Sequence, residues 1–134
     1  MQPFSTPVTA HTNGIVVSVM PRYERTMSHE RGRQFMYTYH IIIENVSAQA
    51  VQLLSRHWHI LDSMVGLREV VGDGVVGEQP VIMPGHTYEY SSGCQLSGDH
   101  GAMWGTYTMQ YFPDGATFEV EIPRFLMELP AIAN

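Results

Sequence analysis

Two histidines in the sequence have a spacing suited to metal binding. They are His57 and His59, in the run Ser55-Arg56-His57-Trp58-His59. Residues two apart on a β-strand project to the same side, so the two imidazoles are expected to lie close enough to ligate one metal ion. His86, after a Pro-Gly turn, is a candidate third ligand. The pattern predicts a divalent-cation site, and the alternative is two solvated or hydrogen-bonded surface histidines.

A glycine-rich run offers a second kind of chemistry. Gly72, Gly74 and Gly77 match the pattern G-x-G-x-x-G after a short predicted strand. In dinucleotide-binding proteins such glycines open a helix whose N-terminal amides bind pyrophosphate, but Pro80 and Pro84 follow here and exclude a helix. The glycines therefore either supply positive φ angles in a loop or present N–H groups as a small anion nest. In the second case Arg56 or Arg68 would add positive charge.

Residues typical of other catalytic sites are missing. The one cysteine, Cys94, has no cationic neighbour in the sequence, so a buried and unreactive thiol is expected. No Ser-His-Asp order, paired catalytic carboxylates or metalloprotease helix pattern is visible. A single cysteine cannot form an internal disulfide and fits a reducing compartment. We therefore expect a cytoplasmic protein that is not an enzyme.

The amino-acid composition limits the classes of partner and ligand that the protein could bind. The chain has 134 residues, a net charge of −6, and seven arginines but no lysine. An acidic chain argues against nucleic-acid binding, which needs clustered basic residues, and the absence of lysine excludes a P-loop and Schiff-base chemistry. Its apolar runs are far shorter than the roughly 20 residues of a membrane-spanning helix. Any bound anion must therefore meet arginine, histidine or backbone N–H groups.

The elements expected to position these residues are β-strands. Gly and Pro, at 12 and 8 residues, interrupt the chain too often for a long helix, whereas short alternating patterns are frequent. Strands are predicted over 15–20, 35–44, 51–61, 67–71, 86–92, 103–112 and 117–123, with loops over 22–33 and 72–85. About seven antiparallel strands without helices predict an immunoglobulin- or fibronectin type III-like β-sandwich, one domain over 1–134 with its core at about 14–130. The tail 125–134 is expected to pack along an edge.

Alternation also predicts which way the side chains point. In the strand 51–61, one face would carry Leu54, Arg56, Trp58 and Ile60, and the other Leu53, Ser55, His57, His59 and Leu61. Trp58 is expected to fill the core between the sheets. Trp104 has the opposite parity from Met103 and Tyr107, so it either belongs to an exposed partner-binding patch or covers the open face of its own sheet.

Several blocks of the sequence together resemble the ApaG family. The blocks are V-Q-L-L-S-R-H-W (51–58), G-D-G-V-V-G-E-Q-P (72–80), P-G (84–85), Y-S-S-G (90–93), G-A-M-W-G-T-Y (101–107) and F-E-V-E-I-P-R-F (118–125). The resemblance implies a small bacterial protein with a fibronectin III-like sandwich, whose domain also occurs in eukaryotic F-box proteins. It further implies an association with cobalt and magnesium resistance and efflux, without an established biochemical activity. Trp104 departs from the small or charged residue that is more usual at this position.

Two functions follow from these observations. The first is a non-enzymatic module that recognises a protein partner through the glycine-rich loop and the adjacent strand, with a site shaped by Arg56, Trp58, Arg68, Gly72, Gly74, Gly77, Glu78 and Gln79. The second is binding of a divalent metal through His57, His59 and His86, or of a phosphate-containing small ligand at the loop. A homodimer formed through open edge strands is a third possibility. No cofactor other than a divalent cation is expected.

Overall fold

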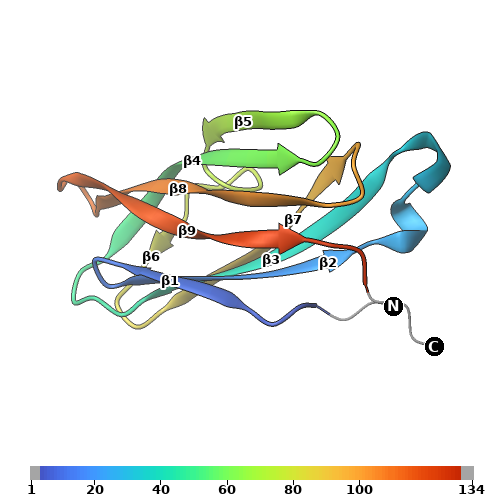
Figure 1. Ribbon diagram of the computed structural model, residues 1–134. Helices are drawn as coiled ribbons and strands as arrows, with labels where there is room; N and C mark the ends of the chain where they lie inside the picture. Colours follow the sequence, from blue (N-terminus) through green and yellow to red (C-terminus); the bar gives the residue numbers. More distant parts are fainter. Residues whose placement is uncertain (1–3, 131–134) are drawn as a thin grey trace.

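The computed structural model describes residues 4–130, and they form an all-β structure (Figure 1). The strands in chain order are β1 (Val8–Thr12), β2 (Ile15–Tyr23), β3 (Phe35–Asn45), β4 (Val51–Asp62), β5 (Gly66–Asp73), β6 (Val81–Ile82), β7 (Thr87–Leu96), β8 (Gly101–Tyr111) and β9 (Thr117–Met127). Two short 3-10 turns, η1 (Arg25–Met27) and η2 (Glu30–Gly32), lie between β2 and β3.

The strands form two antiparallel sheets packed face to face. One sheet has the order β1-β2-β3-β7, and the other has the order β5-β4-β8-β9, with β6 pairing the start of β4. Figure 1 shows the second sheet as the upper layer and the first as the lower layer. The predicted antiparallel β-sandwich is therefore confirmed.

Alternating apolar residues explain why these segments form strands and how the layers pack. Along β3 every second residue from Phe35 to Asn45 is buried, as the sequence pattern predicts. Trp58 of β4 is 3% exposed and lies between the sheets, with its ring centroid 5.4 Å from that of Tyr39 and 6.0 Å from that of Phe125. The expectation that Trp58 belongs to the core is confirmed.

A β-bulge in β4 changes one predicted face. The pairing of β4 with β8 slips between Leu53 and Ser55, so that Leu54 is an extra residue. Val51 and Leu53 are therefore buried before the bulge, and Trp58 and Ile60 after it. The prediction that Leu53 shares a face with the histidines is wrong, because an inserted residue reverses the alternation.

A second bulge lies in β9, opposite Trp104. Between Met103↔Phe125 and Gly105↔Ile122 the strand β9 contains one more residue than β8. Pro123, which has no N–H to donate, sits in this bulge, and the strand continues beyond it to Met127. The predicted end of the strand at 123 is therefore too early, and residues 125–127 extend the sheet. Residues 131–134 of the predicted tail lie outside the described residues.

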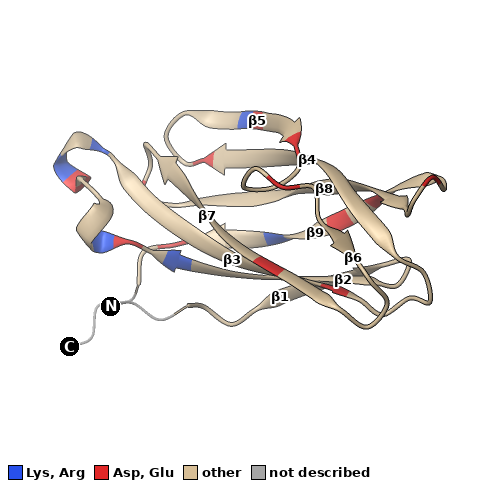
Figure 2. Ribbon diagram, turned by 180° about the vertical axis from the view of Figure 1, so that it is seen from behind, with Lys and Arg blue, Asp and Glu red and all other residues tan. Residues whose placement is uncertain are grey.

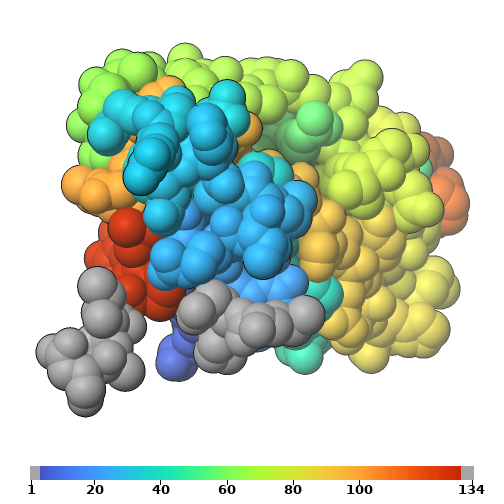
Figure 3. All heavy atoms as spheres, turned by 90° about the vertical axis from the view of Figure 1, so that its right-hand side faces the viewer, coloured from blue at the N-terminus to red at the C-terminus, as the bar shows by residue number. Residues whose placement is uncertain are grey.

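Other differences concern short or edge elements. The strands β1 and β6 were not predicted, so that nine strands are found in residues 4–130 where about seven were expected. The strand β2 continues through Pro21 to Tyr23 and pairs with β3 over this length. The pairing of β2 with β1 stops at Val19, so Pro21 lies beyond β1 and its missing N–H breaks no hydrogen bond between these two strands. The segment 22–33, predicted as a loop, contains η1 and η2, coloured blue to cyan in Figure 3.

The two lateral sides of the sandwich differ. On one side β9 and β1 approach, and the Glu121 amide donates a hydrogen bond to Thr12 Oγ1 at 3.1 Å. On the other side the edge strands β5 and β7 stand apart, and Arg68 of β5 reaches across to the carbonyl of Gln95 on β7. Charged residues are sparse along the strands, and both signs gather near the β2–β3 connection (Figure 2). Within residues 4–130 no helix is long and apolar enough to cross a membrane.

Candidate functional site

A cleft of about 480 Å³ opens between the edge strands β5 and β7. Apolar and aromatic side chains from both sheets line its inner part, among them Trp58, Ile60, Tyr90 and Met103. Arg56, Arg68, Asp73, Val76, Cys94 and Gln95 line the remainder. We call this space the arginine cleft.

Arg56 lies on β4 after the bulge and two residues before Trp58. Its side chain therefore projects to the same inner face of the sheet as that of Trp58. Its Nη1 atom donates to the carbonyl oxygens of Asp73 and Gly74, both at 2.9 Å. Arg56 pairs with Gly72 across β4 and β5, and a Cβ atom at Gly72 would lie 2.9 Å from both Nη1 and Nη2. The absence of a side chain at residue 72 therefore makes room for the guanidinium.

Arg68 enters the same cleft from β5. Its Nη2 atom donates to the Gln95 carbonyl at 3.1 Å and contacts Cys94 Sγ at 3.6 Å. The ion pairs found among residues 4–130 include neither Arg56 nor Arg68, so no described carboxylate lies within 4.0 Å of either guanidinium. A guanidinium has five N–H donors, and the recorded bonds of each arginine use one of its terminal nitrogens. The cleft thus holds two positive charges with donors to spare.

The thiol and hydroxyl groups near the arginines are protonated at neutral pH. Burial raises the pKa of Cys94, although the nearby Arg68 acts in the opposite direction. Burial also raises the pKa of Tyr90 and of Tyr107, whose hydroxyl groups hydrogen-bond each other beneath the cleft. Cys94 is buried, as expected. None of the three supplies a nucleophilic anion here.

The glycine-rich loop is a tight turn with no following helix. Val75 and Glu78 exchange two backbone hydrogen bonds at 2.8 and 2.9 Å, and the residues between them, Val76 and Gly77, have φ of 42° and 82°. Positive φ at both central residues is the pattern of a type I′ turn. Gly74 has φ of 60°, and a Cβ there would clash with the Glu78 carbonyl oxygen. The interpretation of Gly74 and Gly77 as residues with positive φ is confirmed.

Glu78 and Gln79 attach this loop to the strands. Gln79 Nε2 donates to the Leu54 carbonyl at 2.8 Å, and the Gly74 amide donates to the same oxygen at 2.8 Å. The Leu54 carbonyl, next to the last β4–β5 pair Ser55↔Asp73, thus accepts two bonds from the loop. Tyr88 donates to Glu78 Oε2 at 2.8 Å, and burial together with this bond raises the pKa of Tyr88 to about 12. Gly74, Glu78 and Gln79 line a separate hollow of about 290 Å³ beside the cleft.

The predicted histidine pair lies on the outer face of β4. His57 and His59 do project to one side, and their rings are stacked with centroids 4.6 Å apart. The third potential ligand is Glu69 of β5, which sequence reasoning missed. A symmetric hairpin around the turn 62–66 would have placed Glu69 opposite His59, so the signal was available. His86 lies between β6 and β7, where its carbonyl accepts the Asn45 amide, and it does not join the pair.

Comparison with known proteins identifies the family. The ApaG domain model matches residues 25–111. The chain belongs to the ApaG family. It is 46% identical over 122 residues to Protein ApaG of Brucella canis, covering 91% of this chain and 93% of that protein. It is 45% identical over 125 residues to Protein ApaG of Sinorhizobium fredii, covering 93% and 95%.

A solved structure supports the same assignment. A crystal structure of an ApaA protein from Bordetella pertussis superposes with a TM-score of 0.83 at 38% identity, covering 98% of each chain. The ApaG resemblance seen in the sequence blocks is confirmed by the family model and by the two relatives named ApaG, which align with more than nine tenths of the chain. These names state no ligand or activity.

Proposed function

We propose that this ApaG protein is a non-catalytic binding module that receives an acidic, extended segment of a protein partner in the arginine cleft. The observation that carries the proposal is the pair of inward guanidiniums, Arg56 and Arg68, without a carboxylate partner among the described residues. Their contacts to backbone carbonyls hold them in place before a ligand arrives. Charged groups fixed in advance cost less to order on binding.

The shape of the cleft favours an extended segment. Its walls are the edge strands β5 and β7, whose outer backbone positions are available for pairing with an added strand. A volume of about 480 Å³ accommodates a few side chains. The protein has a net charge of −6, so an acidic segment would be attracted locally by the arginines rather than by the whole surface.

The experiment is a nuclear magnetic resonance titration of the isotope-labelled protein with capped tetraglutamate. Amide shifts are expected at residues 72–77 and 92–95, and Arg68→Gln should weaken binding at least about tenfold, as loss of a charged hydrogen bond implies. Arg31→Gln is the matched control, because Arg31 is exposed and does not line the cleft. Capped tetraglutamine tests whether charge is required.

Three outcomes separate the possibilities. Shifts at the cleft that depend on Arg68 support the proposal. Binding of inorganic pyrophosphate without binding of the peptide would instead favour a small phosphate-containing ligand at this site. No shift at 72–77 or 92–95 with either probe would exclude the arginine cleft as an acidic-group site.

A further inference from the structure

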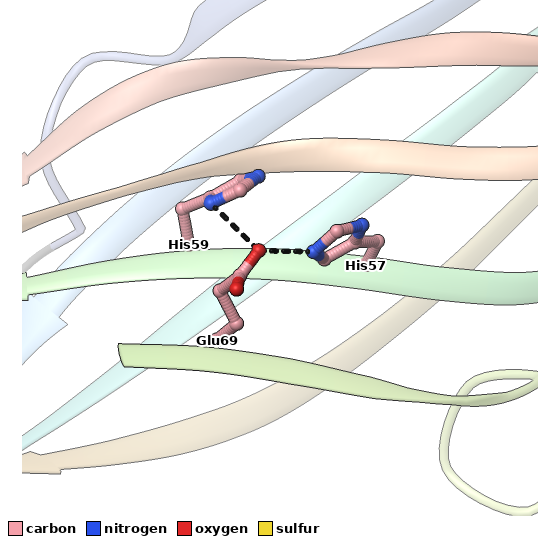
Figure 4. A group of neighbouring side chains, drawn as sticks. All are labelled: His57, His59 and Glu69. Atoms are coloured by element: carbon pink, nitrogen blue, oxygen red, sulfur yellow. Dashed lines mark hydrogen bonds and ion pairs between the residues drawn. The ribbon is translucent and has the colours of Figure 1, made fainter. Parts of the chain in front are cut away.

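A cluster of three potential metal ligands lies on the outer face of the β5-β4-β8-β9 sheet (Figure 4). His57 and His59 belong to β4, and Glu69 stands directly opposite His59 on β5. Arg68 and Val70, the neighbours of Glu69, point to the other side of the sheet and line the arginine cleft. The cluster is therefore separate from the proposed partner site. We call these three residues the histidine cluster.

The spacing of the ligand atoms suits a single ion. Glu69 Oε1 lies 2.8 Å from His57 Nε2 and 3.5 Å from His59 Nδ1. Two ligands that each bind a metal at about 2.1 Å are separated by about 3.0 Å at right angles and by about 3.4 Å in a tetrahedron. All three ligand atoms lie within 4.8 Å of one another. Small side-chain rotations would bring them around one ion.

We propose that His57, His59 and Glu69 bind a divalent transition-metal ion of the zinc, nickel or cobalt type. Two imidazoles and one carboxylate are ligands that these ions accept, whereas magnesium and calcium prefer oxygen ligands alone. The side chains of His57, His59 and Glu69 are 41%, 30% and 56% exposed, so an ion reaches them directly from solvent. Water completes the coordination sphere, and the ion is exchangeable.

Neighbouring side chains orient the His59 ring. Trp104, paired with His59 across β4 and β8, stacks on it with centroids 5.5 Å apart and an angle of 11° between the planes. The Arg124 guanidinium lies 5.1 Å from the centre of the Trp104 ring. Groups that fix a ligating imidazole raise metal affinity by limiting its rotation. Trp104 thus covers the outer face of its own sheet and supports the cluster.

The first experiment is calorimetric titration with zinc. One ion per chain is expected, and the double variant His57→Ala/His59→Ala should lose at least about a hundredfold in affinity, more than the tenfold to hundredfold typical of residues that only support a ligand. The variant His11→Ala/His86→Ala removes two exposed histidines elsewhere and should bind zinc as the unmodified protein does. Magnesium should give no heat of specific binding.

A second measurement does not depend on the folding of a variant. In the unmodified protein, zinc should shift the imidazole nitrogen resonances of His57 and His59 and leave those of His11 and His86 unchanged.

Glu69→Gln should weaken zinc binding at least about tenfold. Equal zinc affinity of the two double variants, or imidazole shifts spread over all histidines, would show that binding is adventitious and overturn the site.

Discussion

Arg56 and Gly72 face each other across β4 and β5, and the guanidinium of Arg56 occupies the space that a side chain at residue 72 would need. A glycine in a strand often marks the close approach of another group, and Gly72, one residue before the end of β5, gives its space to Arg56. Gly72 is also the first glycine of the predicted G-x-G-x-x-G run. Its structural role differs from that of Gly74 and Gly77, which adopt positive φ.

Gly72→Ala should displace the Arg56 guanidinium. A Cβ atom 2.9 Å from Nη1 and Nη2 breaks the two bonds of Arg56 to the Asp73 and Gly74 carbonyls, at a cost of about 1–3 kcal/mol in unfolding free energy. Chemical denaturation measures this loss, and tetraglutamate titration should show weaker binding. Gly93→Ala serves as the control for stability alone, because its nearest neighbour is the flexible end of Met36 and because Gly93 itself lines the cleft. Equal stability of the two variants would contradict this account.

The two cleft arginines should differ in their effect on stability. Arg56→Ala removes a donor shared by two loop carbonyls and is expected to destabilise the protein by about 1–3 kcal/mol. Arg68→Ala removes an exposed bond to the Gln95 carbonyl and a long contact to Cys94 Sγ, and it should cost less than about 1 kcal/mol. Urea denaturation of both variants provides the comparison. If Arg68→Ala is the more damaging change, Arg68 holds the two sheets together and is not chiefly a ligand-binding residue.

The buried carboxylate of Asp62 should make the free energy of unfolding depend on pH in the acidic range. It is 2% exposed and accepts the amides of Met64, Ser97 and Gly98 at 2.8 to 2.9 Å. Burial alone would raise its pKa, but these backbone donors outweigh burial and the pKa is lowered. A carboxyl with a lowered pKa stabilises the folded state above its unfolded pKa of about 3.9, and this contribution disappears as the pH falls through the folded pKa.

Asp62→Asn should therefore cost about 2–3 kcal/mol at neutral pH, because charge-assisted bonds are replaced by weaker ones and donors lose an acceptor. The difference from the unmodified protein should shrink below about pH 4. Denaturation at a series of pH values measures both effects. Asp114→Asn, at an exposed position in the β8–β9 connection, is the control and should be neutral. A difference that persists unchanged in acid would rule out the carboxylate as its source.

The strands were predictable from the sequence where apolar and other residues alternate without interruption along a single segment. The strand β3 shows an uninterrupted period of two, and its predicted range 35–44 differs from Phe35–Asn45 by one residue. The bulge at Leu54 was not predictable, because it depends on the register against β8 and leaves no local sequence signal. Pro123 did mark an irregularity in the last strand, but the sequence alone does not distinguish a bulge there from the end of the strand. The strands β1 and β6 are short edge elements, defined by pairing more than by their own pattern.

Parts of the candidate sites were visible in the sequence for different reasons. The parity of Arg56 with Trp58 placed it on the inner face, and the H-x-H spacing placed His57 and His59 together. The meeting of Arg56 with Arg68, and of Glu69 with the histidines, depends on the β4–β5 register. Cys94 and Gln95 enter the cleft from the opposite sheet, and only tertiary packing brings them there.

Val76 occupies a turn position that its side chain disfavours. A β-branched residue at φ of 42° is an outlier, whereas Asn is enriched in this region and Asn-Gly is a preferred pair for type I′ turns. Val76→Asn should therefore stabilise the protein by about 1 kcal/mol, the lower end of the cost of such strain. Thermal and urea denaturation check the gain, and Val46→Asn, at an exposed valine without positive φ, should give none.

The Val76→Asn variant should bind tetraglutamate within about twofold of the unmodified protein. The reason is that the loop contacts Arg56 and the Leu54 carbonyl through Gly74 and Gln79, and not through Val76. A stabilised variant with much weaker binding would instead show that the strained valine contacts the ligand.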